Sequence, residues 1–353
     1  MHWGTQVSAQ LSRDDRAQDS TGGPRVRQTP VSMTAIADRH RRIASAIANG
    51  LKHVPRLSQS LVELKRGGSR TLFLVHDGDG QTLVYLNLAQ RLPRSSSLSV
   101  VGIEPLRLPG VPLAHPSIEE MAARYIEEIR RLQPHGPYLL GGLCAGGTIA
   151  FEMARQLLRA GDRVACLFIL DAVAPGTPKR QGLAEQRLGR LMHTLTDDGA
   201  RSSRLARAWA VSRIVARKLV NTVSWEIANR PVTWSVAIRY TVLRLLRARG
   251  RGWPRFLPPL SVRQIYLSAD ARYRPGRLSD SSVVLLRARA GVGDDQPYCE
   301  IYADDTLGWG RYADNLTIID VDGGHSSMLQ EPRVQGLAAA MASAVAAATE
   351  SAE

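Results

Sequence analysis

The short segment "LLGGLCAGGTIAF", residues 139–151, places a cysteine at the centre of a glycine-rich turn. Gly142 and Gly146 flank Cys144 at two positions on either side, where a larger side chain would collide in a tight turn between a strand and a helix. A helix that begins near Ala145 would point free backbone N–H groups and its positive dipole end at the sulfur, which favours the thiolate. Cys144 is therefore a candidate nucleophile for acyl chemistry; the alternative is a buried thiol that only fills space.

A thiol nucleophile needs a base, and the base needs a carboxylate to orient it. Of the eight histidines, His325 is the best placed, because in "LTIIDVDGGHSSMLQEP" it follows a strand-like run within a glycine-rich loop. This position predicts that the imidazole lies at an edge of a sheet. His76, at the end of the first strand of the sheet, is the alternative base.

Two positions compete for the orienting acid. Asp171 directly follows the apolar run "LFIL", and the order Cys144, Asp171, His325 is the order nucleophile, acid, histidine of α/β hydrolases. One strand later, "VVLLRARAGVGDD" ends in Asp294 and Asp295. Position along the chain favours Asp171 and leaves the second site open.

The oxyanion of an acyl-transfer transition state needs preorganised N–H donors. The residue after the nucleophile, Ala145, supplies one of them, and the loop "VHDGDG" at residues 75–80 supplies the other, for which we select Gly78. This loop has neither a GxGxxG pattern nor a Walker lysine, so a phosphate-binding role is not indicated.

Short apolar strands alternate with helical segments on both sides of the cysteine. This alternation predicts βαβ crossovers and a mostly parallel sheet flanked by helices. The expected strands are "TLFLVH" (71–76), "LSVVGIE" (98–104), "YLLGGL" (138–143), "VACLFILD" (164–171), "SVRQIYL" (261–267), "SVVLLRAR" (282–289) and "LTIIDV" (316–321), and the expected helices are 82–92, 117–132, 147–159 and a closing helix over 333–348.

Composition sets the limits of the domain organisation. The 353 residues are 44% hydrophobic, which is enough for a full core, and the three cysteines are too widely spaced for a disulfide framework or a metal site. Residues 1–57 are expected to form a largely disordered extension with a short helix near 33–49, and residues 58–353 the folded domain. Since no signal peptide or run of about 18 apolar residues is visible, we expect a cytoplasmic protein without stable membrane insertion.

The basic charge is concentrated in one segment. Residues 179–255 hold 17 Lys and Arg against four acidic residues, a net +13, within an overall net charge of +14. Residues 180–258 show helical periodicity and no convincing strand, which predicts a helical lid inserted into the sheet domain. Its charge suits an acidic partner surface, whereas a merely solvated basic face is the alternative.

Four ordered motifs together resemble the thioesterase domains that end nonribosomal peptide and polyketide assembly lines. They are "LFLVHDGDG" with "YLNLAQRL", "YLLGGLCAGGTIAFEMA", "LFILDAVAPG" and "TLGWGRYADNLTIIDVDGGHSSMLQEP". The resemblance implies an α/β-hydrolase fold with a helical lid over about 180–258, and a triad of Cys144, Asp171 and His325. Most of this family carries serine where this chain has cysteine.

The resemblance also implies the reaction. We expect the enzyme to bind no cofactor of its own and to take an acyl or peptidyl group from the phosphopantetheine thioester of an acidic carrier protein, docked near the basic lid, onto Cys144. Release would follow by cyclisation, aminolysis or hydrolysis, and a stand-alone transacylase that moves acyl groups between carriers is the alternative. A hypothesis of another class is an inert hydrolase fold whose basic lid binds nucleic acid or protein; we expect no nucleic-acid partner.

Overall fold

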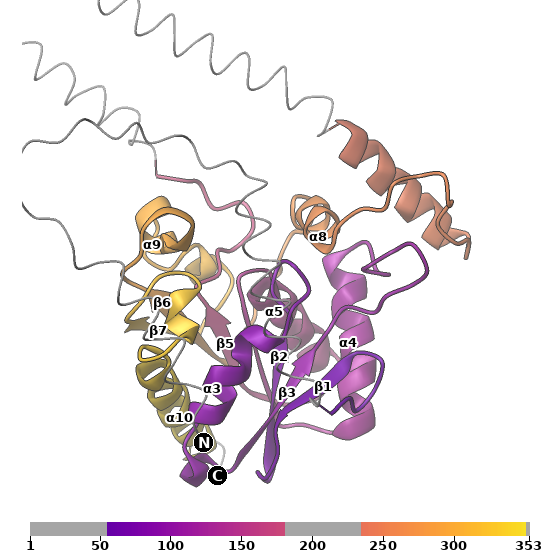
Figure 1. Ribbon diagram of the computed structural model, residues 1–353. Coiled ribbons are helices and arrows are strands. Elements are labelled where there is room, and N and C mark those ends of the chain that lie inside the picture. The colour runs from indigo at the N-terminus through magenta and orange to yellow at the C-terminus, as the bar shows by residue number, and fades with distance from the viewer. Residues whose placement is uncertain (1–54, 181–233, 351–353) are drawn as a thin grey trace, which may run out of the picture. The chain divides into compact units, whose positions relative to one another are not determined.

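The computed structural model describes residues 55–180 and 234–350 (Figure 1). By its internal contacts the chain divides into Met1–Lys52 and His53–Glu353. Residues 1–54 of the expected extension, with its expected helix near 33–49, and most of the expected lid, residues 181–233, lie outside the described residues. None of the helices in the described ranges is long and apolar enough to cross a membrane.

A seven-stranded sheet forms the centre of the domain, in the order β1-β3-β2-β4-β5-β6-β7. The strands are β1 (Leu61–Lys65), β2 (Arg70–Val75), β3 (Leu98–Ile103), β4 (Tyr138–Leu143), β5 (Val164–Leu170), β6 (Ser282–Ala288) and β7 (Leu316–Val321). All neighbours pair in parallel except β1, which runs antiparallel to β3. The continuous apolar runs of the central strands arise because both faces of the sheet are covered. The predicted α/β-hydrolase fold class is confirmed.

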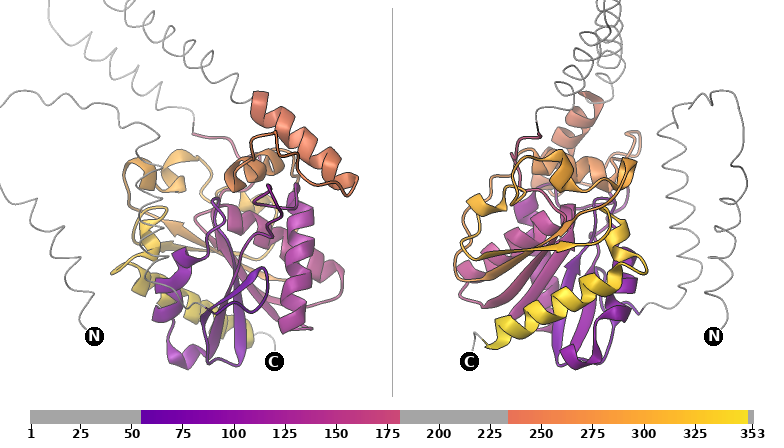
Figure 2. Two further views of the ribbon diagram at one scale, coloured as in Figure 1. Left: turned by 45° about the vertical axis from the view of Figure 1, so that its right-hand side comes forward. Right: turned by 90° about the vertical axis from the view of Figure 1, so that its left-hand side faces the viewer.

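Helices cover both faces of this sheet (Figures 1 and 2). The helices are α3 (Leu86–Arg91), α4 (Ile118–Leu132), α5 (Ala145–Arg159), α8 (Val262–Asp270), α9 (Tyr298–Ile301) and α10 (Val334–Glu350). Helices α4 and α5 pack into one apolar cluster, and α3 and α10 pack into the cluster on the opposite face. Because the described helices pack on both faces, the ends of the strands are the natural place for functional side chains.

The prediction of a strand at 261–267 is wrong, because these residues begin helix α8. Ser261 caps the helix: its hydroxyl accepts from the backbone N–H of Gln264, and the Gln264 side chain accepts from the Ser261 N–H. The buried residues Val262, Ile265, Tyr266 and Ala269 recur at helical spacing. The capping box of Ser261 and Gln264 therefore indicates a helix, although the apolar residues of this segment resemble those of a strand.

The described part of the expected lid is a helix over 234–248 and the loop that follows it. The helix is attached to the domain through Tyr240 and Leu243, which are buried, and the Tyr240 hydroxyl donates to the carbonyl of Pro116. Trp234 and Ile238 on the same helix are exposed.

Candidate active site

Cys144 occupies a strained turn between β4 and α5. Strand β4 ends at Leu143 and α5 begins at Ala145, so that Cys144 alone connects them, with φ 53° and ψ −116°. Its N–H donates to the carbonyl of Leu170 at 3.1 Å. A side chain at Gly142 would lie 2.3 Å from the backbone carbon of Gly146, so this close approach requires glycine. The turn thus holds the thiol at the carboxyl end of the sheet.

The register of the sheet brings Asp171 to the same edge. Leu143 pairs with Leu170, and Leu170 pairs with Leu286, so the residue after β5 emerges between β4 and β6. Asp171 is fully buried and has a positive φ of 37°. Its Oδ1 accepts from the N–H of Ala288 at 3.3 Å, which fixes the orientation of the carboxylate.

His325 contacts this carboxylate directly. The Nδ1 atom of His325 lies 2.8 Å from Oδ2 of Asp171, with the imidazole mostly buried. This contact places a proton on Nδ1 and leaves Nε2 as the nitrogen that can exchange a proton with a reacting group. Among the acids considered from the sequence, the structure therefore brings Asp171 to the imidazole.

Asp295 supports the histidine loop instead. Its Oδ1 accepts from the N–H groups of Ser326 and Ser327 at 2.7 and 3.0 Å, and its Oδ2 accepts from the Ser327 hydroxyl at 2.6 Å. Its backbone carbonyl also accepts from the His325 N–H at 2.9 Å. The side chain of Asp294 lies outside the described residues.

The electrostatics of the site favour an ion pair between sulfur and imidazole. Burial raises the pKa of the Cys144 thiol, but the hydrogen bond and positive charge of His325, followed by hydrogen bonds from Tyr298 and Ala145, lower this pKa below its ordinary value. Burial lowers the pKa of His325, but hydrogen bonds to Asp171 and Cys144 raise it to about 10. A thiolate beside an imidazolium is a competent nucleophile with a proton donor next to it.

A tyrosine that the sequence analysis did not consider completes this cluster. The hydroxyl oxygen of Tyr298 lies 3.3 Å from the sulfur of Cys144. Its ring stacks on the imidazole of His325, with centroids 4.5 Å apart and planes at 29°. Tyr298 lies in "GDDQPYCE" without any catalytic spacing pattern, so only its place after the competing acid position could have drawn attention to it.

The two residues selected for the oxyanion hole lie next to each other. A Cβ at Gly78 would be 3.9 Å from the Cβ of Ala145. The loop that holds Gly78 is ordered by Asp77, whose Oδ1 accepts from the N–H groups of Asp79 and Gln81 at 3.0 and 2.9 Å. An ordered loop beside the first turn of α5 is the arrangement that two converging N–H donors require.

The alternative base, His76, is engaged elsewhere. It is fully buried, with Nε2 2.8 Å from the Tyr125 hydroxyl and Nδ1 2.7 Å from the carbonyl of Asp77. Burial lowers its pKa to about 4. His76 is therefore a neutral structural side chain next to the loop that holds Gly78. The described ranges also contain no group of three or more His, Cys, Asp or Glu residues that could hold a metal ion.

Residues 70–223 match the family model described as Thioesterase domain. Malpibaldin synthetase from Mortierella alpina is 41% identical over 112 residues, which are 31% of this chain and 2% of that protein. The non-reducing polyketide synthase stmB from Aspergillus ustus is 42% identical over 120 residues, 34% of this chain and 6% of the relative. The chain thus spans only a small part of the length of these relatives.

Among solved structures, a four-domain nonribosomal peptide synthetase bound to AMP and glycine is similar in fold. The match has a TM-score of 0.50 and 24% sequence identity, and it covers 89% of this chain and 22% of that one.

Proposed function

We propose that this chain, which matches the Thioesterase domain family model over residues 70–223, takes an acyl or peptidyl group from the phosphopantetheine thioester of a carrier protein onto Cys144. Release then follows by cyclisation, aminolysis or hydrolysis. The observation that carries this proposal is the cluster of Cys144, His325 and Asp171 at the strained turn after β4.

In the acylation step, the Cys144 thiolate attacks the thioester carbonyl. The carbonyl oxygen becomes an oxyanion, which the N–H groups of Ala145 and Gly78 stabilise. When the intermediate collapses, the bond between carbon and the pantetheine sulfur breaks, and His325 gives its Nε2 proton to the departing thiolate. Asp171 holds the imidazole in the required tautomer and stabilises its positive charge.

The cysteine matters for the second step. A serine acyl-enzyme would be an oxygen ester, lower in energy than the incoming thioester, whereas the acyl-Cys144 intermediate is itself a thioester. Acylation is then close to isoenergetic, and the acyl group remains activated for a demanding acceptor such as an amine or the nucleophile of a ring closure. A second carrier thiol is equally accessible in energy, so transfer between carriers is the alternative outcome.

A carrier partner is supported by charge. Phosphopantetheine is anionic and carrier proteins are typically acidic, while residues 179–255 carry a net +13. Within the described residues, Arg244, Arg249 and Arg251 of this segment are exposed. Such a surface would accelerate the encounter with an acidic protein in a salt-dependent way. The names of the relatives, a synthetase and a polyketide synthase, agree with a role in assembling acyl chains.

Intact-protein mass spectrometry tests the first step. After mixing with an acyl-pantetheine thioester, we expect one acyl adduct on the wild-type chain, none on Cys144→Ala, and an unchanged adduct on Cys299→Ala, which removes a partly exposed thiol next to the site. No adduct on the wild type, or an adduct that persists in Cys144→Ala, would refute the proposal and favour an inert fold whose basic segment binds nucleic acid or protein.

Product analysis tests the second step. The isolated acyl-enzyme is divided among water, an amine and a second holo-carrier, and the acceptor that removes the acyl group fastest identifies the outcome. In Cys144→Ser we expect the products to shift from transfer or cyclisation toward the hydrolysed acid. Unchanged product ratios in this variant would show that the thiol does not determine the acceptor.

A further inference from the structure

Tyr298 contacts each member of the candidate triad. Its hydroxyl lies 3.3 Å from the Cys144 sulfur, and its ring stacks on the His325 imidazole with centroids 4.5 Å apart. Its backbone N–H donates at 3.4 Å to Oδ2 of Asp171, the same oxygen that faces Nδ1 of His325. One residue from α9 therefore makes three different kinds of contact with three groups from three other segments.

The protonation state determines the direction of the hydroxyl contact. Burial, followed by the charge of the Cys144 thiolate, raises the pKa of the Tyr298 phenol above its ordinary value. The phenol therefore keeps its proton while the thiol loses its own. A thiolate has no hydrogen to give, so the hydroxyl must donate to the sulfur whenever the sulfur is charged.

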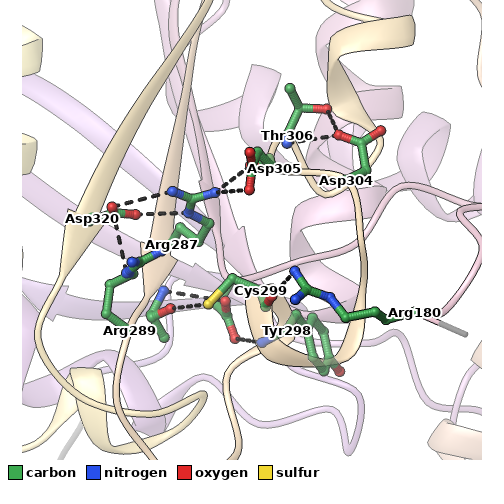
Figure 3. Close-up of polar contacts among 11 residues, drawn as sticks. Arg180, Arg287, Arg289, Tyr298, Cys299, Asp304, Asp305, Thr306 and Asp320 are labelled. Carbon is green, nitrogen blue, oxygen red and sulfur yellow. Dashed lines mark hydrogen bonds and ion pairs between the residues drawn. The ribbon is translucent and has the colours of Figure 1, made fainter. Parts of the chain in front are cut away.

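The backbone around Tyr298 is fixed by further contacts (Figure 3). The sulfur of the next residue, Cys299, donates at 3.1 Å to the carbonyl of Ala288, the last residue of β6. The Cys299 carbonyl accepts from the Arg180 guanidinium at 3.5 Å, and the Arg180 N–H donates to the carbonyl of Ile301 at 2.8 Å. These contacts hold α9 in place, so the hydroxyl can be preorganised toward the sulfur.

We propose that Tyr298 is a further catalytic residue, whose hydroxyl donates a hydrogen bond to the Cys144 sulfur whenever that sulfur is negatively charged. This occurs twice in a turnover. The attacking thiolate is charged before acylation. During release, the acceptor gives its proton to Nε2 of His325 as it forms its bond to the acyl carbon, the bond between carbon and the Cys144 sulfur breaks, and the electron pair returns to the sulfur. The hydroxyl keeps its proton throughout.

This inference rests on Cys144 being the nucleophile of the proposed function, but it makes a separate claim about the sulfur. The hydrogen bond stabilises Cys144 as a leaving group, which a thioester intermediate requires if the acyl group is to pass to an amine or a second thiol. The stacked ring and the N–H contact with Asp171 also position His325, so the hydroxyl must be tested without removing the ring.

The test is the pH profile of Cys144 alkylation by iodoacetamide in the full chain, followed by site-resolved peptide mass spectrometry. Tyr298→Phe keeps the ring and removes only the donor. Loss of one hydrogen bond to a charged group changes a pKa by about one unit. In Tyr298→Phe we therefore expect the midpoint of the alkylation profile to rise by about one pH unit and the turnover number to fall about tenfold. Among the described residues, the negative charge of the sulfur also acts on the charged side chains of His325 and Arg263 and on the phenols of Tyr85, Tyr266 and Tyr302, which it helps to keep neutral.

Tyr302→Phe is the matched control. Its ring meets the Tyr298 ring edge-on, with centroids 5.8 Å apart, and loss of its hydroxyl should leave the midpoint in place. A ring-fluorinated tyrosine at position 298, which is a stronger donor in the same shape, should move the midpoint below that of the wild type. An unchanged midpoint in both the Phe and the fluorinated variants overturns the inference.

The two proposals fail separately. Alkylation needs no thioester substrate. A shifted alkylation midpoint in Tyr298→Phe, together with no acyl adduct on the wild-type chain, would refute the proposed function and support the hydrogen bond. A normal adduct with an unshifted midpoint would remove only the role of Tyr298.

Discussion

Replacement of Asp171 by Asn tests the charge arrangement most directly. In the wild type, the hydrogen bonds of His325 to Asp171 and Cys144 raise the pKa of the imidazole to about 10. The substitution removes the carboxylate whose Oδ2 lies 2.8 Å from Nδ1 and keeps the size of the side chain. The imidazolium therefore loses one of the two groups that stabilise its proton.

The size of the effect follows from the contact. A hydrogen bond to a charged group contributes about 1.5 to 3 kcal/mol, which is about one to two pKa units. Since the acylation step uses the Cys144 thiolate together with the His325 imidazolium, its rate should fall at high pH where the imidazolium loses its proton. This fall at high pH is the upper limb of the pH profile. We expect its midpoint to move from about pH 10 in the wild type to about pH 8 to 9 in Asp171→Asn.

The assay is kcat/KM for an acyl-pantetheine thioester as a function of pH, since this ratio reports the free enzyme. Asp295→Asn is the matched control, because Asp295 bonds to Ser326 and Ser327 and to no atom of the imidazole ring. It should lower the rate by loosening the loop and leave the upper limb in place. An upper limb that stays fixed in Asp171→Asn and moves in Asp295→Asn would show that Asp171 is not the acid that stabilises the imidazolium.

Two further substitutions test the supports of the site. Gly142→Ala should lower the free energy of unfolding by about 3 kcal/mol in chemical denaturation, because the added Cβ would lie 2.3 Å from the backbone of Gly146. Gly252→Ala is the control and should be near neutral, because a Cβ there meets nothing within 4 Å. Equal effects of the two substitutions would contradict the close packing of the turn. Burial lowers the pKa of His76 to about 4, so lowering the pH from about 6.5 toward 4 protonates this histidine in the unfolded chain first. The free energy of unfolding of the wild type should therefore fall by about 3 kcal/mol more than that of His76→Gln over this range, as urea unfolding at several pH values would measure. Parallel dependences of stability on pH in the two proteins would count against a buried neutral imidazole.

The sequence predicts those features of this domain that depend on local patterns. The apolar runs, the helical periodicity around residues 118–132 and the glycines beside Cys144 act within a few residues of chain, and the structure places strands, α4 and the strained turn there. The closing helix near 333–348 is likewise observed as α10. Strand β1, "LVELK", is not predicted from the sequence, because its short mixed run becomes a strand only through antiparallel pairing with β3.

Features that depend on the order of the strands in the sheet cannot be predicted from short stretches of sequence. Nothing in the residues around Asp171 states that β5 lies between β4 and β6, yet this order brings the carboxylate close to a histidine 154 positions later. Tyr298 escaped for the same reason, since its three contacts come from segments far apart in the sequence. A tyrosine after an unremarkable loop carries no local signal.

The hydrogen bonds of Asp171 and Asp295 explain why these two acids near His325 have different roles. The Asp295 carboxylate accepts three hydrogen bonds from Ser326 and Ser327, so it is already committed to the loop that carries His325. Asp171 accepts longer hydrogen bonds, from the N–H of Ala288 through Oδ1 at 3.3 Å and from the N–H of Tyr298 through Oδ2 at 3.4 Å, and Oδ2 also makes the short bond to Nδ1. A carboxylate engaged by three neutral donors has less capacity left to stabilise an imidazolium. The acid that touches the imidazole and the acid that places its loop are therefore separable, and a substitution at each should leave a different trace in the pH profile.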